Sequence, residues 1–179
     1  MSLQPGNLFI ATAIASALLV TPVVAQTPSY SQVIRSSWDS IKRNVSESAA
    51  EMPDADFAFK PTPDVRTFGQ LIGHMANEHY AVCSAVKGEK NPSADDIEKT
   101  TAKADLVKAI NDSIAYCDAA YSSMSDAAGL QKIKLFDQEW TKAAALQFNV
   151  THDSEHYGNL VTYLRMKKLV PPSSKRQSM

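Results

Sequence analysis

Apolar residues recur every three or four positions along most of the sequence, a spacing typical of helices with one buried face. Glycine is rare, and no segment shows a clear alternating strand pattern. The pattern therefore predicts an all-α protein with four helices. They are expected at about residues 30–52, 67–87, 102–124 and 138–168.

Local signals support these boundaries. Three prolines in PDADFAFKPTPDV break the first helix, and the paired prolines of VPP stop the fourth because they remove backbone donors. Thr67 and Gln70 form a predicted capping box at the start of the second helix. The same spacing gives the apolar residues expected to face the core: Val33, Trp38, Ile41 and Val45; Phe68, Leu71, Ile72, Met75, Val82 and Val86; Leu106, Ile110, Ile114 and Tyr121; and Leu146, Val150, Tyr157, Leu160, Val161 and Leu164.

Four amphipathic helices of this length favour a four-helix bundle. The chain shows no internal repeat and no second zone of composition, so a single domain is expected. A net charge of -1, with no Lys/Arg-rich run apart from the tail SSKRQSM, argues against nucleic acid as a partner. The long connections leave the helix topology open.

The N-terminal segment NLFIATAIASALLV is an uncharged apolar run of the length of a signal-peptide core, and Val23 and Ala25 supply small residues for cleavage. We therefore expect residues 1–25 to be a signal peptide and residues 26–179 to be the mature domain, exported to the periplasm or secreted. An uncleaved membrane anchor is the alternative, although the run is shorter than the ~20 residues that a span needs. No stable membrane insertion is expected after cleavage.

Export to an oxidising compartment would permit a disulfide between Cys83 and Cys117, the two cysteines of the chain. Two buried free thiols are the alternative, because the sequence does not show whether the Cα atoms come within bridging distance. Cys83 lies nine residues after His74, about 180° around the second helix, so a bridge is expected to lie away from any site at His74.

The stretch HDSEHYGN places His152 and His156 one turn apart on the same face of the fourth helix, where both could bind one ion. Two core or solvated histidines are an equally reasonable interpretation. HDSEH also matches the HxxEH pattern of inverted zinc proteases, with Glu155 as the general base. That class needs a further ligand downstream, and the residues after His156 include no histidine or carboxylate. Any third ligand must therefore lie upstream.

Asp153 and Glu155 lie between the two histidines and point in different directions. Glu155 falls toward the polar face of the predicted helix. Asp153 points into the apolar stripe, which makes it the better candidate for orienting a ligand histidine. The alternative is a buried aspartate that hydrogen-bonds a hydroxyl or amide on a neighbouring helix.

The second helix carries His74 and His79, which lie about 140° apart and cannot both bind one ion. His74 lies at the edge of the apolar stripe, with Glu78 one turn away on the same side. His79 falls inside the stripe and is interpreted as a core histidine. Packing that brings His74 against His152 and His156 would assemble three neutral imidazoles and leave a coordination position open, as catalytic metal sites do.

The segments VRTFGQLIGHMANEHY and HDSEHYGNLVTYLRMKKLVPPSS resemble the DinB-like family of metalloenzymes, and the resemblance spans most of the mature chain. It implies a four-helix bundle of up-down-down-up order. It also implies a divalent metal ion, zinc or nickel, held by His74, His152 and His156. Some relatives are thiol-dependent transferases of the cytoplasm, so the predicted export of this chain argues against a mycothiol- or bacillithiol-type cosubstrate.

Two functions are compatible with such a site. The first is a metal-dependent hydrolase or transferase acting on a small molecule, with Glu78, Asp153 and Tyr157 as candidate catalytic residues. The second is a non-catalytic metal-binding or stress-related protein of the envelope. A third interpretation is a bundle whose histidines only pack. The sequence does not indicate the substrate, and it leaves both a monomer and a homodimer open.

Overall fold

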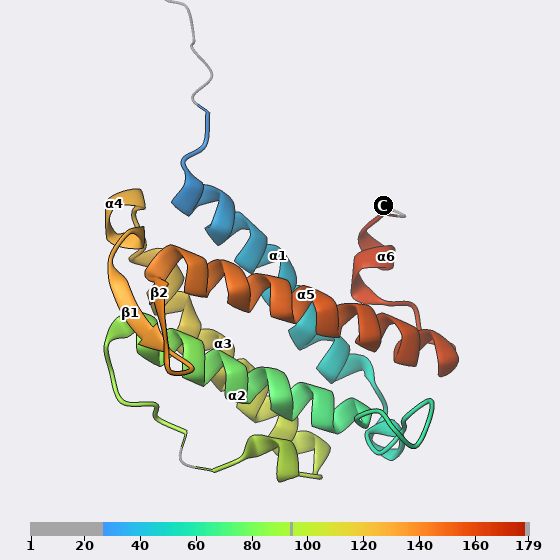
Figure 1. Ribbon diagram of the computed structural model, residues 1–179. Helices are drawn as coiled ribbons and strands as arrows, with labels where there is room; N and C mark the ends of the chain where they lie inside the picture. The colour runs from blue at the N-terminus through green and yellow to red at the C-terminus, as the bar shows by residue number, and fades with distance from the viewer. Residues whose placement is uncertain (1–26, 94, 178–179) are drawn as a thin grey trace, which may run out of the picture.

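The computed structural model describes residues 27–93 and 95–177, which are mostly helical with one small sheet (Figure 1). Within these residues, each of the four long helices packs against two others: α1 against α3 and α5, and α2 against α3 and α5. The predicted signal peptide, residues 1–25, lies outside the described residues. The elements are α1 (Tyr30–Glu51), η1 (Asp54–Asp56), α2 (Phe68–Lys87), η2 (Ile97–Lys99), α3 (Lys103–Ser122), α4 (Asp126–Gly129), β1 (Lys132–Leu135), β2 (Gln138–Thr141), α5 (Lys142–Met166) and α6 (Pro172–Gln177).

Capping interactions explain where the first two long helices begin. The predicted capping box of α2 is confirmed, because the Thr67 hydroxyl accepts from the Gln70 amide while the Gln70 side chain accepts from the Thr67 amide. Ser29 and Gln32 form the same arrangement at α1. At the other end of α2, Gly88 adopts the left-handed conformation that closes a helix without steric cost.

Most of the apolar residues expected to face the core are buried; Val161 of α5 is only partly buried, and α1 differs from the expectation at one position. Val33 is exposed, and the buried residue one turn before Trp38 is Ile34. Trp38 is itself 1% exposed and stacks on Tyr121 of α3. The other three predicted positions of α1 are buried, and residues 34, 38, 41 and 45 keep the stricter three-to-four spacing of one helical face.

The predicted start of the last long helix at Gln138 is wrong. Residues 138–141 form β2, which pairs antiparallel with β1, and α5 begins at Lys142 with Thr141 as its N-cap. Phe136 and Asp137 make the tight turn, both with positive φ. The hairpin lies beside the N-terminal half of α5 (Figure 1), and β1 also contacts α2. The all-α prediction thus holds for all but this short two-stranded sheet.

The C-terminal end of α5 also differs from the prediction. The helix ends at Met166, and Lys168 takes a positive φ of 63°. The chain therefore leaves the helix before it reaches the prolines. The next helix, α6, starts at Pro172; proline is tolerated at the first position of a helix because an N–H there would make no hydrogen bond within the helix. The short α6 packs against α1.

A disulfide joins Cys83 of α2 to Cys117 of α3, with the two Cα atoms 5.3 Å apart. Both residues are completely buried. The bridge lies in the core between these two helices. Of the two alternatives for the cysteines, the structure therefore has the disulfide and not the free thiols.

In the part of the chain that the structure describes, no helix combines the length and apolar character needed to cross a bilayer.

Candidate metal centre

The centre is built between α2 and α5, which run antiparallel. Arg66 lies near Tyr163, His74 lies near His156 and His152, and His79 lies near Asp153, so the numbering falls along one helix as it rises along the other. This register places the edge of the α2 apolar face directly against the matching edge of α5. Histidines that share those edges are brought together.

The structure brings together His74, His152 and His156, the three predicted ligands. The Nε2 atom of His152 lies 3.1 Å from the Nε2 atoms of both His74 and His156. Within the described residues, these three histidines form the group of potential metal ligands whose nitrogen atoms all lie within 4.8 Å of one another. Each imidazole therefore turns its Nε2 toward a shared centre and its Nδ1 away from it.

Glu98 fixes the orientation of His74. Its Oε2 atom lies 3.3 Å from Nδ1 of His74, and its Oε1 atom accepts from Nε of Arg66 at 2.8 Å. With Nδ1–H donated to the carboxylate, the lone pair of His74 lies on Nε2 and faces the centre. Glu98 belongs to the short turn η2, far from any helical pattern.

Gly73 explains why η2 can approach α2 so closely. A Cβ at this position would lie 2.7 Å from both the Glu98 Cα and the Ile97 carbonyl oxygen. These atoms are backbone and cannot move aside as a flexible side chain would. The absence of a side chain at residue 73 therefore places the Glu98 carboxylate within reach of the neighbouring His74.

The donor set fits a divalent cation. Nitrogen ligands at the usual ~2.0–2.1 Å from zinc, at tetrahedral angles, lie about 3.3–3.4 Å apart, close to the observed 3.1 Å separations. Without a cation, the Nε2 lone pair of His74 faces the Nε2 of His152, which also contacts His156. Asn159 lies 3.4 Å from Nδ1 of His156, on its outward side. The chemistry of the three nitrogens therefore suits a metal site.

Electrostatics keep the three imidazoles neutral. Burial, together with the charges that His156 and His74 would carry, lowers the pKa of His152 to about 3. Burial also lowers the pKa of His74, with a further contribution from Arg66, and it lowers the pKa of His156, with a further contribution from His74. Neutral imidazoles keep the lone pairs that metal binding needs.

His79 is a core histidine, as predicted, and it changes the interpretation of Asp153. Both side chains are completely buried, and Nε2 of His79 lies 2.8 Å from Oδ2 of Asp153. The Nδ1 atom of His79 lies 2.9 Å from the Ser113 hydroxyl. The prediction that Asp153 orients a ligand histidine is therefore wrong: it contacts a histidine that faces away from the centre. The network instead ties α2, α3 and α5 together behind the centre.

The other two candidate catalytic residues have different surroundings. The hydroxyl of Tyr157 donates to the Ser173 hydroxyl and accepts from the Ser173 amide, so it faces α6 and not the histidines. Glu78 has a buried Oε1 atom with no hydrogen-bond partner, and burial raises its pKa to about 7. Glu78 precedes His79, which contacts Asp153, so the antiparallel register puts Glu78 at the height of His152 along α2. Tyr157 follows His156 but turns its hydroxyl toward α6, which leaves Glu78 as the candidate of the two for a role at the centre.

A cleft of about 680 Å³ reaches the centre beside His156. Most of its lining side chains are polar or charged, including Arg66, Glu98, Glu155 and Asn159. Its volume is in the range of small-molecule sites. Helical periodicity identified none of Arg66, Glu98 and Asn159 as site residues, because two lie in or next to connections and Asn159 falls on a polar face.

Comparisons with known proteins agree with this architecture. The structure is similar to a DinB-like protein from Bacillus cereus, with 15% identity, a TM-score of 0.68 and coverage of 78% of this chain and 93% of that one. It is also similar to a DinB-like protein from Bacillus subtilis, with 20% identity, a TM-score of 0.62 and coverage of 76% and 92%.

A third similar structure is a mycothiol-dependent maleylpyruvate isomerase, with 17% identity, a TM-score of 0.60 and coverage of 73% of this chain and 60% of that one. Identities this low establish likeness of fold alone. No curated protein matches the chain. The DinB superfamily matches residues 38–160, which is more than half of the sequence, and the chain therefore belongs to the DinB superfamily.

Proposed function

We propose that this protein binds one divalent metal ion, zinc or nickel, through His74, His152 and His156, and acts as a metal-dependent enzyme on a small molecule. The observation that carries the proposal is the clustering of three imidazole nitrogens within 4.8 Å of one another, with Nε2 of His152 3.1 Å from Nε2 of both His74 and His156. Three protein ligands leave a coordination position open, which is the arrangement of catalytic and not of structural zinc sites. Zinc and nickel both suit imidazole ligands.

The residues around the centre support a catalytic role. A bound ion would supply Lewis acidity toward an oxygen or sulfur atom of a substrate. Glu98 keeps the proton of His74 on Nδ1, and Arg66 holds that carboxylate in place. The cleft gives a small molecule access beside His156. Glu78, whose pKa of about 7 suits exchange of a proton near neutral pH, is the candidate acid or base.

The reaction class is hydrolysis or group transfer. The similar fold of a mycothiol-dependent maleylpyruvate isomerase supports transfer involving a thiol, because that protein depends on a thiol cosubstrate. The signal peptide proposed for residues 1–25 favours hydrolysis, because an exported enzyme works outside the compartment where low-molecular-weight thiols are kept. We further propose the up-down-down-up helix order that the resemblance implies, and cleavage of the chain after Ala25. The intact mass of the protein purified from the envelope fraction tests the cleavage.

Calorimetric titration of the apoprotein with zinc and with nickel tests the metal site. One ion per chain is expected, and His156→Ala should abolish tight binding. Thr151→Ala is the matched control, because Thr151 is an exposed residue of the same helix whose hydroxyl donates to the backbone carbonyls of Gln147 and Phe148. Equal binding by the His156→Ala variant would contradict the assignment.

A screen of the metal-loaded protein against hydrolase and thiol-transfer substrates tests the activity. Glu78→Gln should lose turnover and keep its metal. A protein that binds the ion but turns over none of these substrates would support the alternative of a non-catalytic metal-binding protein.

A further inference from the structure

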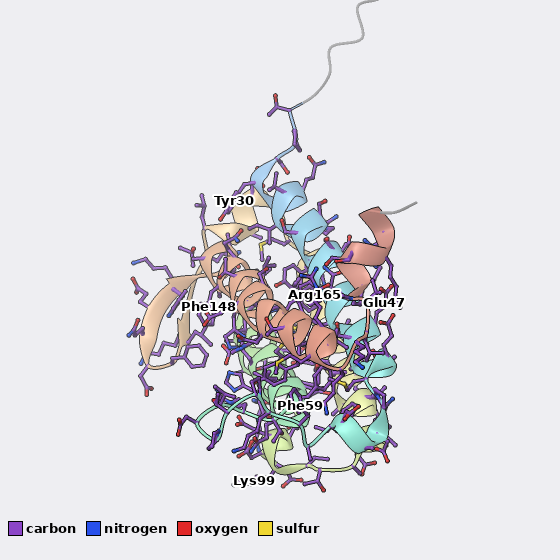
Figure 2. All side chains as sticks on the ribbon, turned by 90° about the vertical axis from the view of Figure 1, so that its right-hand side faces the viewer. Tyr30, Glu47, Phe59, Lys99, Phe148 and Arg165 are labelled. Carbon is purple, nitrogen blue, oxygen red and sulfur yellow. A yellow bond between two sulfur atoms is a disulfide. The ribbon has the colours of Figure 1, made fainter. Side chains whose placement is uncertain are left out.

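Three aromatic side chains form a row that leads from the hairpin to the histidines. The ring of Phe148 in α5 contacts those of Phe136 at the hairpin turn and Trp140 of β2, with ring centroids 6.0 Å and 5.5 Å away. The Phe148 ring also lies 5.8 Å from the ring of His152. Figure 2 shows Phe148 on the side of α5 that carries the hairpin. We call Phe136, Trp140 and Phe148 the aromatic wall.

The tip of the wall is held in a costly conformation. Phe136 has a φ of 50° and is followed by Asp137 with a φ of 59°, where tight hairpin turns usually carry asparagine and glycine. A bulky residue in the left-handed region is strained, and strained residues cluster at ligand sites. The ring is nevertheless 50% exposed, so burial in the core does not explain why a phenylalanine stands there.

Several buried polar atoms of the wall, the centre and α2 lack hydrogen-bond partners. Within the described residues, three of the five buried side-chain polar atoms that lack a hydrogen bond belong to Glu78, Trp140 and His152. Glu78 lies at the height of His152 by register, and Trp140 contacts Phe148. The unpaired indole N–H is a donor, and the Oε1 atom of Glu78 can accept. Buried polar groups are normally satisfied, so the unpaired indole N–H of Trp140 in the aromatic wall and the unpaired Nδ1 of His152 beside Phe148 mark positions where a ligand would supply the missing partner.

We propose that the aromatic wall binds a planar aromatic group of the ligand that coordinates the metal. The ring would pack on Phe148 and Phe136, and a polar substituent would meet the indole N–H of Trp140. The polar end of the same ligand would extend toward the cleft at His156. This inference rests on the proposed function, because it takes the metal as the anchor of the ligand.

Two chelators separate the metal from the wall. Acetohydroxamate and benzohydroxamate bind a metal ion through the same group and differ in whether a methyl or a phenyl is attached to it. Titrated into the zinc-loaded protein, benzohydroxamate is expected to bind at least about tenfold more tightly, because burial of the ring adds to the shared metal contact. Equal affinities would overturn the inference while leaving the metal site intact. Failure of both to bind the zinc-loaded protein would instead refute the open coordination position of the proposed function, on which the inference rests.

Phe136→Gly is the decisive variant. It removes the ring and relieves the positive φ, so the melting temperature should stay the same or rise. Benzohydroxamate should bind about two- to tenfold more weakly, the range for loss of one aromatic contact, while acetohydroxamate binding should not change. Tyr30→Ala is the matched control, because Tyr30 is an aromatic residue of similar exposure, 52%, at the start of α1. Unchanged benzohydroxamate affinity in Phe136→Gly, or an equal loss in Tyr30→Ala, would contradict the proposal.

Discussion

Reduction of the disulfide between Cys83 and Cys117 should separate the stability of the fold from the affinity of the metal site. The bridge closes a loop with a sequence separation of 34 residues. In the chain-entropy treatment, cross-linking such a loop restricts the unfolded chain by about 12–13 cal/mol/K, or about 3.8 kcal/mol at 25 °C. A domain of this size loses about 2–4 °C of melting temperature for each kcal/mol. Reduction should therefore lower the melting temperature by about 8–15 °C.

The metal affinity should change little under the same treatment. Cys83 lies nine residues beyond His74, about 180° around α2, and faces α3, whereas His74 faces α5. The contacts of Glu98 and the buried pair of His79 and Asp153 hold the two faces of α2 independently of the bridge. Reduced protein should accordingly bind zinc within about threefold of the affinity of the oxidised protein.

The assay is thermal unfolding followed by circular dichroism, with and without reductant, combined with zinc calorimetry on both forms. Counting thiols after unfolding verifies complete reduction, which should expose two. A Cys83→Ala, Cys117→Ala double variant is the control, because its melting temperature should not respond to reductant. A fully reduced wild type that melts at the original temperature would refute the loop-entropy reasoning. A large loss of zinc affinity on reduction would show that the orientation of α2 depends on the bridge.

Three further predictions concern the surroundings of the metal centre. Glu98→Gln should weaken zinc binding by about 10- to 100-fold in calorimetry, because His74 loses the carboxylate that orients it; unchanged affinity would refute that role. Gly73→Ala should both lower the melting temperature and weaken zinc, since a Cβ collides with the backbone of η2; stable protein with normal affinity would show that η2 docks otherwise. In the apoprotein, Glu78→Gln should add nothing at pH 4 and about 1–2 kcal/mol to the free energy of unfolding at pH 8. The native pKa of about 7 exceeds the ordinary 4.5, so stability is lost as the carboxyl ionises through that window, and partial exposure reduces the effect. Urea titrations at the two pH values measure it, and an equal gain at both would contradict this reading.

The helices could be predicted because they depend on a period that the sequence carries, and the resemblance to the DinB-like family implied which three histidines cluster. His74, His152 and His156 lie at the edges of apolar stripes, and antiparallel packing of two stripes brings their edges together. The hydrogen-bond partners of polar side chains on the apolar face of α5 are harder to predict. The apolar face of α5 contacts α1, α2 and other elements, so a helical wheel does not decide that Tyr157 meets Ser173 or that Asp153 meets His79.

The parts that sequence reasoning missed depend on contacts outside any regular period. KIKL alternates over only four residues, and the turn that follows carries Phe136 and Asp137 in place of the glycine or asparagine that signals a tight hairpin. Glu98 reaches His74 only because η2 docks against Gly73. The sequence around a single glycine in a helix does not indicate which distant segment packs against it.

The turn of the hairpin before α5 can be changed separately from its strands, which pack against α2 and α5. Its base is closed by a backbone hydrogen bond from Lys142 to the Gln131 carbonyl, at 2.9 Å, and Thr141 serves as the N-cap of the helix that follows. The turn at residues 136 and 137 lies at the far end from this base, and His152 lies almost three helical turns beyond the cap. The length and sequence of the turn can therefore be exchanged while the strand ends and the cap keep the register of α5. The turn is therefore a suitable site for grafted or randomised sequences. Such changes would alter which small molecules the centre accepts and would leave the metal-binding histidines in place.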